Sequence, residues 1–144
     1  MFNILSGLQE GSRSVVIVSR QVNSGQGPFL KGGIVVTSAG KVSAAAVTDI
    51  PFIEFVLEDL TGNSSGQLTC AYGVMEAETD NIDDSTNGAI TTDSLLTAVA
   101  GKLTTATAAE ITAGQFLGKC ISTSTVVNMV AGTSAKVVRF RTRN

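Results

Sequence analysis

The chain contains no histidine and no tryptophan, and it has only two prolines and two cysteines in 144 residues. The lack of histidine removes the commonest general base, and with it the Ser-His and Cys-His arrangements of nucleophilic enzymes. No Walker-type phosphate loop occurs, and Gly25-Gln26-Gly27 does not continue into a dinucleotide-binding fingerprint. Two thiols are too few for a zinc site, which needs four nitrogen or sulfur ligands. We therefore predict that the protein is not an enzyme and uses no cofactor.

The sequence also lacks any apolar run close to the ~18 residues that a membrane span requires. Residues 1–5 have neither a basic start nor a long apolar stretch, so we expect no secretion signal and no membrane partner. Cys70 and Cys120 are compatible with one disulfide bridge. We interpret them instead as small, buried apolar side chains.

Aromatic residues make up only 5% of the chain and charged residues 15%, whereas glycine, serine and threonine are abundant. The apolar residues are mostly alanine and valine, so the core must be built from small side chains. This composition favours many short strands joined by polar turns. At a length that suits one domain, the sequence predicts a mainly β fold with at most short helices.

Residues 1–31 have the composition of an extended N-terminal arm. Val15-Val16-Ile17-Val18 is the strongest strand signal in this part, and glycine- and serine-rich segments typical of turns or linkers surround it. A segment of this kind either folds back on its own domain or lies on a partner. We therefore divide the chain into an arm, residues 1–31, and a β-rich domain, residues 32–144.

A faint internal repeat predicts two β-hairpins. The segment Ser38-Ala39-Gly40-Lys41-Val42 resembles Val99-Ala100-Gly101-Lys102-Leu103, and an apolar run precedes the Ala-Gly-Lys turn in both. Glycine readily adopts the positive φ that such a turn needs, and the small or β-branched flanking residues favour strands.

Several later segments also have clear patterns. Residues 67–75 alternate as a strand with Leu68, Cys70, Tyr72 and Val74 on one face. Residues 107–111 favour one helical turn before Gly114. Residues 50–60 fit a helix face and a strand equally well, so both alternatives stay open.

Two strands are predicted near the C-terminus, at residues 116–121 and 136–141. Within the second strand, Val138 and Phe140 face one way, and Arg139 and Arg141 face the other.

The acidic stretch contains a segment that resembles the first half of a calcium loop. Asp83, Ser85 and Asn87 would supply oxygen ligands, with Gly88 at the sharp bend and Ile90 at the usual apolar position. The closing glutamate is absent, because Ser94 stands at that position. We therefore interpret the segment as a polar turn, with a weak cation site as the alternative.

Charge is distributed unevenly along the chain. Residues 49–93 contain ten acidic residues and no basic one, whereas residues 1–48 and 94–144 are both basic. A nucleic-acid-binding domain would be basic overall, so this pattern argues against that function. We expect the acidic middle to pair with the basic terminal segments of another copy or with a basic partner. Pairing within one chain, and acids that simply keep the surface soluble, are the alternatives.

From Gly32 onward the chain contains a series of short motifs. They are, in order, the glycine-led hairpin Gly33 to Val42, the loop and strand Gly62 to Gly73, Glu78-Thr79-Asp80, Leu95-Leu96, Gly101-Lys102-Leu103-Thr104, Phe116-Leu117-Gly118-Lys119 and Val137-Val138-Arg139-Phe140. The order of these motifs resembles that of the head-decoration, or capsid-cement, proteins of tailed bacteriophages. The resemblance covers about three-quarters of the chain.

This resemblance implies a small β-barrel or β-tulip-like domain that docks, often as a homotrimer, on the outer surface of the capsid after assembly in the host cytoplasm. The implied partners are the major capsid protein and further copies of the chain, and the family has no catalytic residues. Within that framework we predict that Val15 to Val18 add as a strand to a partner and that Arg139, Arg141 and Arg143 make charge contacts. Pairing of that strand within the chain, and a solvated arginine face, are the alternatives. Another phage virion component, such as a head fibre, tail or baseplate element, and a cellular β-module that binds carbohydrate or a cation are alternative functions.

Overall fold

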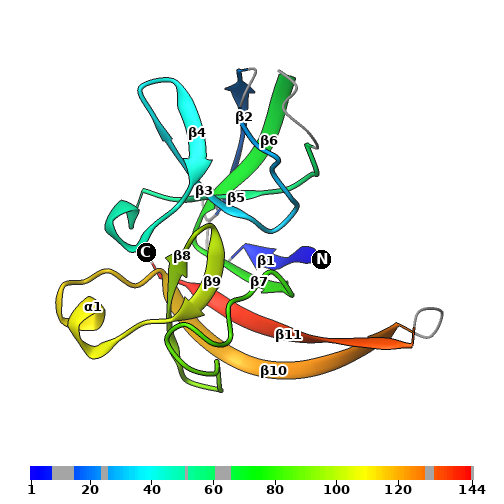
Figure 1. The fold of residues 1–144 in the computed structure, drawn as a ribbon, viewed down its shortest axis with the longest axis vertical. Coiled ribbons are helices and arrows are strands. Elements are labelled where there is room, and N and C mark those ends of the chain that lie inside the picture. Colours follow the sequence, from blue (N-terminus) through cyan, green and yellow to red (C-terminus); the bar gives the residue numbers. More distant parts are fainter. Residues whose placement is uncertain (8–14, 24–25, 51, 61–65, 129–131, 144) are drawn as a thin grey trace.

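The computed structural model describes residues 1–7, 15–23, 26–50, 52–60, 66–128 and 132–143, and these form two curled antiparallel sheets (Figure 1). The six-stranded sheet has the order β1 (Phe2–Gly7), β7 (Met75–Thr79), β11 (Thr133–Thr142), β10 (Gly118–Asn128), β8 (Leu95–Val99) and β9 (Lys102–Thr105). The five-stranded sheet has the order β2 (Val15–Val22), β6 (Gly66–Gly73), β5 (Glu54–Val56), β3 (Ile34–Ser38) and β4 (Lys41–Ala44). Helical structure in the described residues is limited to η1 (Val47–Asp49) and α1 (Ala108–Thr112). The prediction of a mainly β fold with at most short helices is confirmed.

The two hairpins predicted from the internal repeat are present, one in each sheet. Ala39 and Gly40 join β3 to β4 with φ angles of 50° and 74°, and Ala100 and Gly101 join β8 to β9 with φ angles of 48° and 75°. Two successive residues with positive φ give a turn whose twist matches that of the flanking strands. Alanine therefore adopts the left-handed conformation in both turns beside the glycine that the sequence singled out.

The two hairpins meet where the sheets approach each other. The Ile34 amide donates to the Gly101 carbonyl at 2.9 Å, and the Gly101 amide donates to the Ala45 carbonyl at 3.0 Å. A Cβ atom on Gly101 would lie 3.1 Å from the Ile34 carbonyl oxygen and 3.2 Å from the Cβ of Ala44. The close approach of the sheets thus depends on a residue without a side chain at position 101. Around Gly40 the space is open.

The main core lies between the two sheets and centres on three phenylalanines. Phe55 of β5 packs against Phe2 of β1 and Phe140 of β11, with ring centroids 5.4 Å and 5.6 Å apart. All three are at most 2% exposed. A second, smaller cluster fills the curl of the five-stranded sheet and consists of Val22, Phe29, Val35, Val42, Val56, Leu68 and Cys70.

The described part of the predicted arm belongs to the two sheets. β1 pairs with β7, and β2 pairs with β6 along its whole length from Val15 to Val22. Phe2 stacks in the main core and Val22 lies in the second cluster, so residues 1–31 are not separated from residues 32–144 as we expected. Of the two alternatives for this segment, folding back on the domain is the one observed. Residues 8–14 and 24–25 lie outside the described part.

The ambiguous segment 50–60 contains a strand, β5, preceded by η1. Glu54, Phe55 and Val56 are all buried, because Phe55 faces the main core while Val56 faces the second cluster. A strand covered on both faces shows no alternation of apolar and polar residues, which is why the pattern did not distinguish it from a helix.

The helical turn predicted before Gly114 is α1. The Thr107 side chain accepts a hydrogen bond from the Glu110 amide, and the Glu110 side chain accepts one from the Thr107 amide, which forms a capping box. Gly114 follows the helix with a φ of 73°. Side-chain bonds of this kind hold the ends of a helix that is too short to be stable by itself.

The alternation predicted near the C-terminus is confirmed in β11. Val138 and Phe140 are fully buried, whereas Arg139 and Arg141 are exposed on the opposite face. Both C-terminal strands are longer than predicted, because β10 continues to Asn128 and β11 begins at Thr133.

Candidate interaction surfaces

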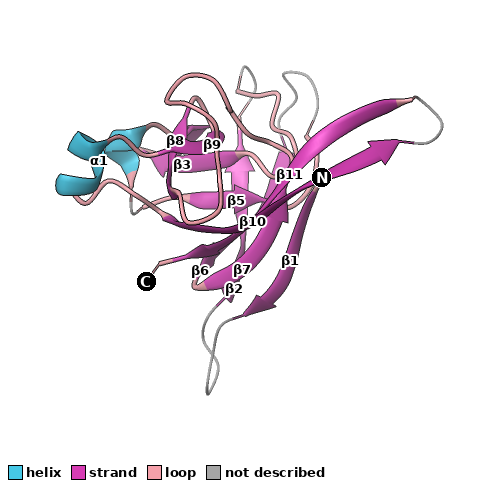
Figure 2. Cartoon of the chain, turned by 90° about the horizontal axis from the view of Figure 1, so that it is seen from below, coloured by secondary structure: helices cyan, strands magenta, loops and turns pink. Residues whose placement is uncertain are grey.

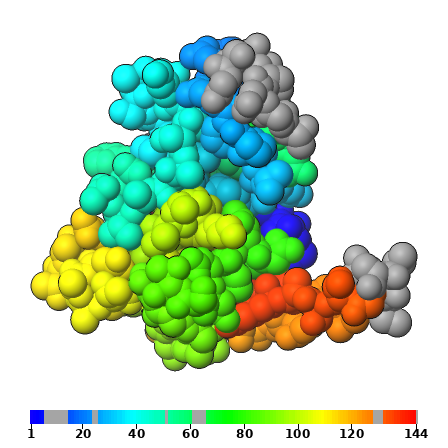
Figure 3. All heavy atoms as spheres, viewed as in Figure 1, coloured from blue at the N-terminus to red at the C-terminus, as the bar shows by residue number. Residues whose placement is uncertain are grey.

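The strands β10 and β11 continue beyond the six-stranded sheet as a two-stranded ribbon that stands out from the rest of the molecule (Figures 2 and 3). β10 pairs with β8 only at Gly118 and Lys119, and β11 pairs with β7 only from Val138 to Arg141. Within the described part of the chain, residues 122–128 therefore pair only with β11, and residues 133–137 pair only with β10. We call these two segments the β-ribbon; its longer strand spans about 24 Å at the usual rise per residue.

The β-ribbon is uncharged apart from Lys136 at its base. A shift in the pairing register at Ile121 marks the point where β10 leaves the sheet. Along the ribbon, residues 122–127 and 133–135 are exposed, and Val126 and Val127 are 50% and 56% exposed. Natural proteins protect strand edges with charge, proline or short length, and apart from Lys136 the described residues of this ribbon contain no charge and no proline. It is therefore suited to pair with another strand.

The strand predicted to add to a partner, Val15 to Val18, instead pairs within the chain, with β6 from Gly73 to Cys70. This was the alternative interpretation of that segment. β2 nevertheless lies at the end of its sheet, and Ile17 is 63% exposed. The outward face of β2 thus remains accessible.

The three C-terminal arginines do not act as one group. Arg139 and Arg141 both contact the carboxylate of Glu76 on β7, with Arg139 Nε 2.5 Å from Oε1 and Arg141 Nη2 3.2 Å from Oε2. The hydrogen bond from Arg139, followed by that from Arg141, holds the pKa of Glu76 below its usual value although burial opposes the shift. Arg143 lies elsewhere, above the ring of Phe116.

Every one of the ten acids between positions 49 and 93 accepts a hydrogen bond or forms an ion pair within its own chain. Five form ion pairs with basic groups, and these are Glu54, Glu76, Asp80, Asp84 and Asp93. Five bond to amides or polar side chains, and these are Asp49, Glu58, Asp59, Glu78 and Asp83. Pairing within the chain, one of our alternatives, is thus observed for five of these acids. Contact of the acids with another copy stays a prediction.

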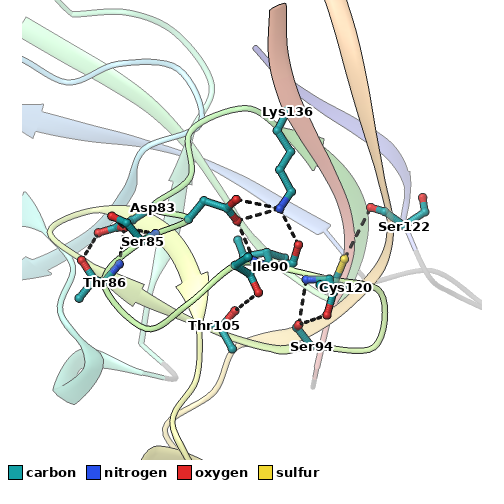
Figure 4. Close-up of polar contacts among 12 residues, drawn as sticks. Asp83, Ser85, Thr86, Ile90, Ser94, Thr105, Cys120, Ser122 and Lys136 are labelled. Carbon is teal, nitrogen blue, oxygen red and sulfur yellow. Dashed lines mark hydrogen bonds and ion pairs between the residues drawn. The ribbon is translucent and has the colours of Figure 1, made fainter.

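Lys136 at the base of the β-ribbon anchors the acidic loop that precedes β8 (Figure 4). Its ammonium group lies 2.8 Å and 2.9 Å from the two carboxylate oxygens of Asp84 and donates to the carbonyl of Ile90 at 2.6 Å. The hydrogen bond from Lys136 lowers the pKa of Asp84, and the amide of Ile90 contributes in the same direction. The loop is thereby joined to the strand that leads into the ribbon.

The candidate calcium ligands in this loop are occupied by local hydrogen bonds. The Asp83 carboxylate accepts from the amides of Ser85 and Thr86 at 3.0 Å and 2.9 Å, and also from both hydroxyls (Figure 4). The Asn87 amide group donates to the carbonyl of Thr105 at 2.9 Å. These bonds, foremost that from the Thr86 hydroxyl, lower the pKa of Asp83. The geometry is that of a polar turn, with Gly88 at the bend (φ 94°).

Cys70 and Cys120 are both free and fully buried, as we interpreted them. Burial raises the pKa of the Cys70 thiol to about 12 and also raises that of Cys120. A thiol that stays protonated is a poor nucleophile, so neither cysteine is suited to chemistry.

A groove that the sequence did not predict lies between the five-stranded sheet and the C-terminal segment. Its volume is about 480 Å³, and it is lined by Arg20, Thr37, Phe52, Ile53, Glu54, Phe55, Tyr72, Gly73, Val74, Phe116, Leu117, Thr142 and Arg143. Four of the seven aromatic residues of the chain line this one groove. They come from positions far apart in sequence, so no local pattern could have indicated it.

One charged pair forms part of the groove wall. Arg20 Nε donates to both oxygens of the Glu54 carboxylate at 3.0 Å, and Glu54 is only 8% exposed. The hydrogen bond to Glu54 raises the pKa of Arg20. A bidentate contact of this kind fixes both side chains.

Among the described residues, no group of three His, Cys, Asp or Glu side chains is arranged to hold a metal ion. In the same part of the chain, no helix has the length and hydropathy needed to cross a membrane.

Comparison with known proteins gives no family. No family model matches the sequence, and no curated protein and no solved structure is significantly similar to it.

Proposed function

We propose that this protein is a head-decoration, or capsid-cement, protein that binds the outer surface of a tailed-phage capsid and stabilises the head. The resemblance in the order of motifs supports this, as does the mainly β fold. The single observation that carries the proposal is the β-ribbon, which projects from the domain with exposed side chains on both faces. In the described part of the chain no third strand pairs with the ribbon, and Lys136 is its one charged residue.

The ribbon has the properties of a docking element. A two-stranded hairpin is at best marginally stable in water by itself, so it gains order when a further strand pairs with it. Strand addition supplies main-chain hydrogen bonds irrespective of sequence, while Val126 and Val127 provide apolar contacts on opposite faces. A ribbon inserted between neighbouring capsid subunits would bridge them and resist their separation under internal pressure.

The proposed partners are the major capsid protein and further copies of this chain, arranged as a homotrimer on the outside of the virion. Residues 15–18 remain candidates for a contact through their outward side chains, and Arg139, Arg141 and Arg143 through their exposed guanidinium groups. A reconstruction of the virion that showed isolated single copies would refute the trimer, whereas a monomer in dilute solution would not.

The test uses heads assembled from the major capsid protein encoded in the same genome and made without this chain. Purified protein is added, and attached copies are counted by sedimentation and by electron cryomicroscopy. We expect a regular array on the outer surface and a higher temperature of head disruption. Failure of the wild-type chain to attach would refute the function.

A ribbon variant and a matched control separate the docking element from the rest of the surface. We expect the double change Val126→Asp and Val127→Asp to weaken attachment at least tenfold, because a charge on each ribbon face opposes close packing. Leu30→Asp places a charge at a residue of similar exposure, 56%, outside the ribbon, and should attach normally. If all three proteins attach equally, the β-ribbon is not the contact.

A further inference from the structure

We propose that the groove lined by Phe52, Tyr72, Phe116 and Arg143 binds small organic anions in which a carboxylate is attached to an aromatic or branched aliphatic group. This inference concerns a ligand site and does not depend on the proposed role in the capsid. The volume of the groove, about 480 Å³, is in the range of ligand pockets.

The apolar part of the ligand is indicated by exposed aromatic surface. Phe52 is 81% exposed, more than any other large apolar side chain in the described residues, and Tyr72, which lines the same groove, is 39% exposed. In a chain with so few aromatic residues, their concentration at one groove gives a surface that water solvates poorly. A flat or branched apolar group placed against Phe52 would remove this surface from water.

The anionic part is indicated by the balance of charge in the groove. The only carboxylate among the lining residues, that of Glu54, is neutralised by Arg20. Arg143 has no carboxylate within ion-pair distance among the described residues; its guanidinium lies 3.9 Å from the centroid of Phe116 and donates to the carbonyl of Gly114. The lining side chains therefore carry one unmatched positive charge, with N–H donors still free to form a charge-assisted pair.

The walls of the groove are held in place by hydrogen bonds from three parts of the chain. The Arg143 amide donates to the carbonyl of Leu117 at 2.8 Å, and the Phe52 amide donates to the carbonyl of Asp49 at 2.8 Å. The buried hydroxyl of Thr142 donates to the carbonyl of Gly73 at 2.8 Å, next to Tyr72. These contacts fix the backbone that carries the arginine and the aromatic residues before a ligand arrives, which limits the entropy lost on binding.

The experiment titrates the full chain with 3-phenylpropionate and with its neutral amide and follows amide chemical shifts by NMR. A peptide arm uses Ala-Ala-Phe with a free C-terminal carboxylate and the same peptide with an amidated C-terminus. We expect saturable shifts at residues 52, 72–74 and 116–117, with each acid binding at least fivefold more tightly than its amide. If 3-phenylpropionate binds and the peptide acid does not, the ligand is a small molecule. If the peptide acid binds as tightly as 3-phenylpropionate, a chain terminus is also a ligand. Both results support the proposal.

Two variants test the assigned contacts. Arg143→Gln should abolish the preference for acid over amide, and Phe52→Leu should weaken binding of both compounds by a similar factor. Arg141→Gln and Leu30→Ala, which change an arginine and an apolar residue outside the groove, should bind like the wild type. Equal binding of acid and amide by the wild-type chain, shifts outside the groove only, or no saturable shift at millimolar concentration would each overturn the proposal. A well-dispersed amide spectrum of each variant confirms that it is folded.

Discussion

The five-stranded and six-stranded sheets share three structural features but pack them against different hydrophobic clusters. Each has a hairpin with an Ala-Gly turn, a nearly buried glutamate paired with arginine, and a buried free cysteine. The two sheets differ in the hydrophobic cluster that covers these features. The second cluster inside the five-stranded sheet is small, whereas the main core between the sheets contains residues from both. We therefore expect similar local chemistry to contribute unequally to stability, and paired substitutions can measure the difference.

The largest effect is expected at β5, where two neighbouring residues face the two clusters. Phe55→Ala removes the central ring of the main core and should lower the free energy of unfolding by about 3–5 kcal/mol. Val56→Ala removes two methyl groups from the second cluster and should lower it by about 2 kcal/mol. Both values are measured by urea denaturation monitored by circular dichroism. A loss for Phe55→Ala no larger than that for Val56→Ala would contradict the larger contribution expected of the main core.

A smaller effect is expected from the two turn glycines, which have nearly the same φ. Gly40→Ala places alanine in a left-handed conformation in open space and should destabilise the protein by about 1 kcal/mol. Gly101→Ala carries the same strain and in addition crowds Ile34 and Ala44, which should add about 1–3 kcal/mol. Thermal and urea unfolding of the two variants give the difference. If they are equally stable, the contact between the hairpins can open without loss.

The smallest of these effects is expected from Glu76→Gln, which weakens the pairing with Arg139 and Arg141. Both arginine side chains are about half exposed, so the effect should be near the lower end for charge-assisted hydrogen bonds. We expect the free energy of unfolding to fall by about 1–2 kcal/mol at pH 7. Asp93→Asn removes the exposed pair with Lys119 and serves as the control, with a nearly neutral effect.

The variant Glu76→Gln also tests how the stability of the protein depends on pH. The arginines hold the pKa of Glu76 below its ordinary value, so its stabilisation is complete above the pKa in the unfolded chain, about 4.3. It is lost as the pH falls through the lower, folded-state pKa. The stability difference between wild type and Glu76→Gln should therefore be constant from pH 8 to about pH 5.5 and shrink below about pH 4. A constant difference down to pH 2 would contradict this assignment.

Local sequence signals predicted much of the fold. The Ala-Gly turns, the helical turn from Thr107 and the alternation around Val138 depend on neighbouring residues, and all three are confirmed. The pairing of Phe2 with a core built from Phe55 and Phe140 depends on residues far apart in sequence. For this reason the sequence of residues 1–31 showed only a linker-like composition and did not indicate that this segment joins the core.

The candidate surfaces were less accessible to sequence reasoning. The β-ribbon consists largely of serine, threonine and valine, whose pattern does not show where a strand leaves its sheet. The groove brings together Phe52, Tyr72 and Phe116 by the packing of three separate segments. The charge pattern was visible, but which acid meets which base follows from strand register, as with Glu76 opposite Arg141.

The pairing of β1 with β7 has a consequence for the order in which the newly made chain folds. Phe2 lies opposite Thr79, and β7 in turn pairs with β11 at the end of the chain. The five-stranded sheet needs only residues 15–73, so we expect it to form while synthesis continues, whereas the first strand must wait for its neighbours. Pulse-labelled hydrogen exchange during refolding should protect β2 and β6 before β1. Simultaneous protection of all strands would show that the two sheets form together.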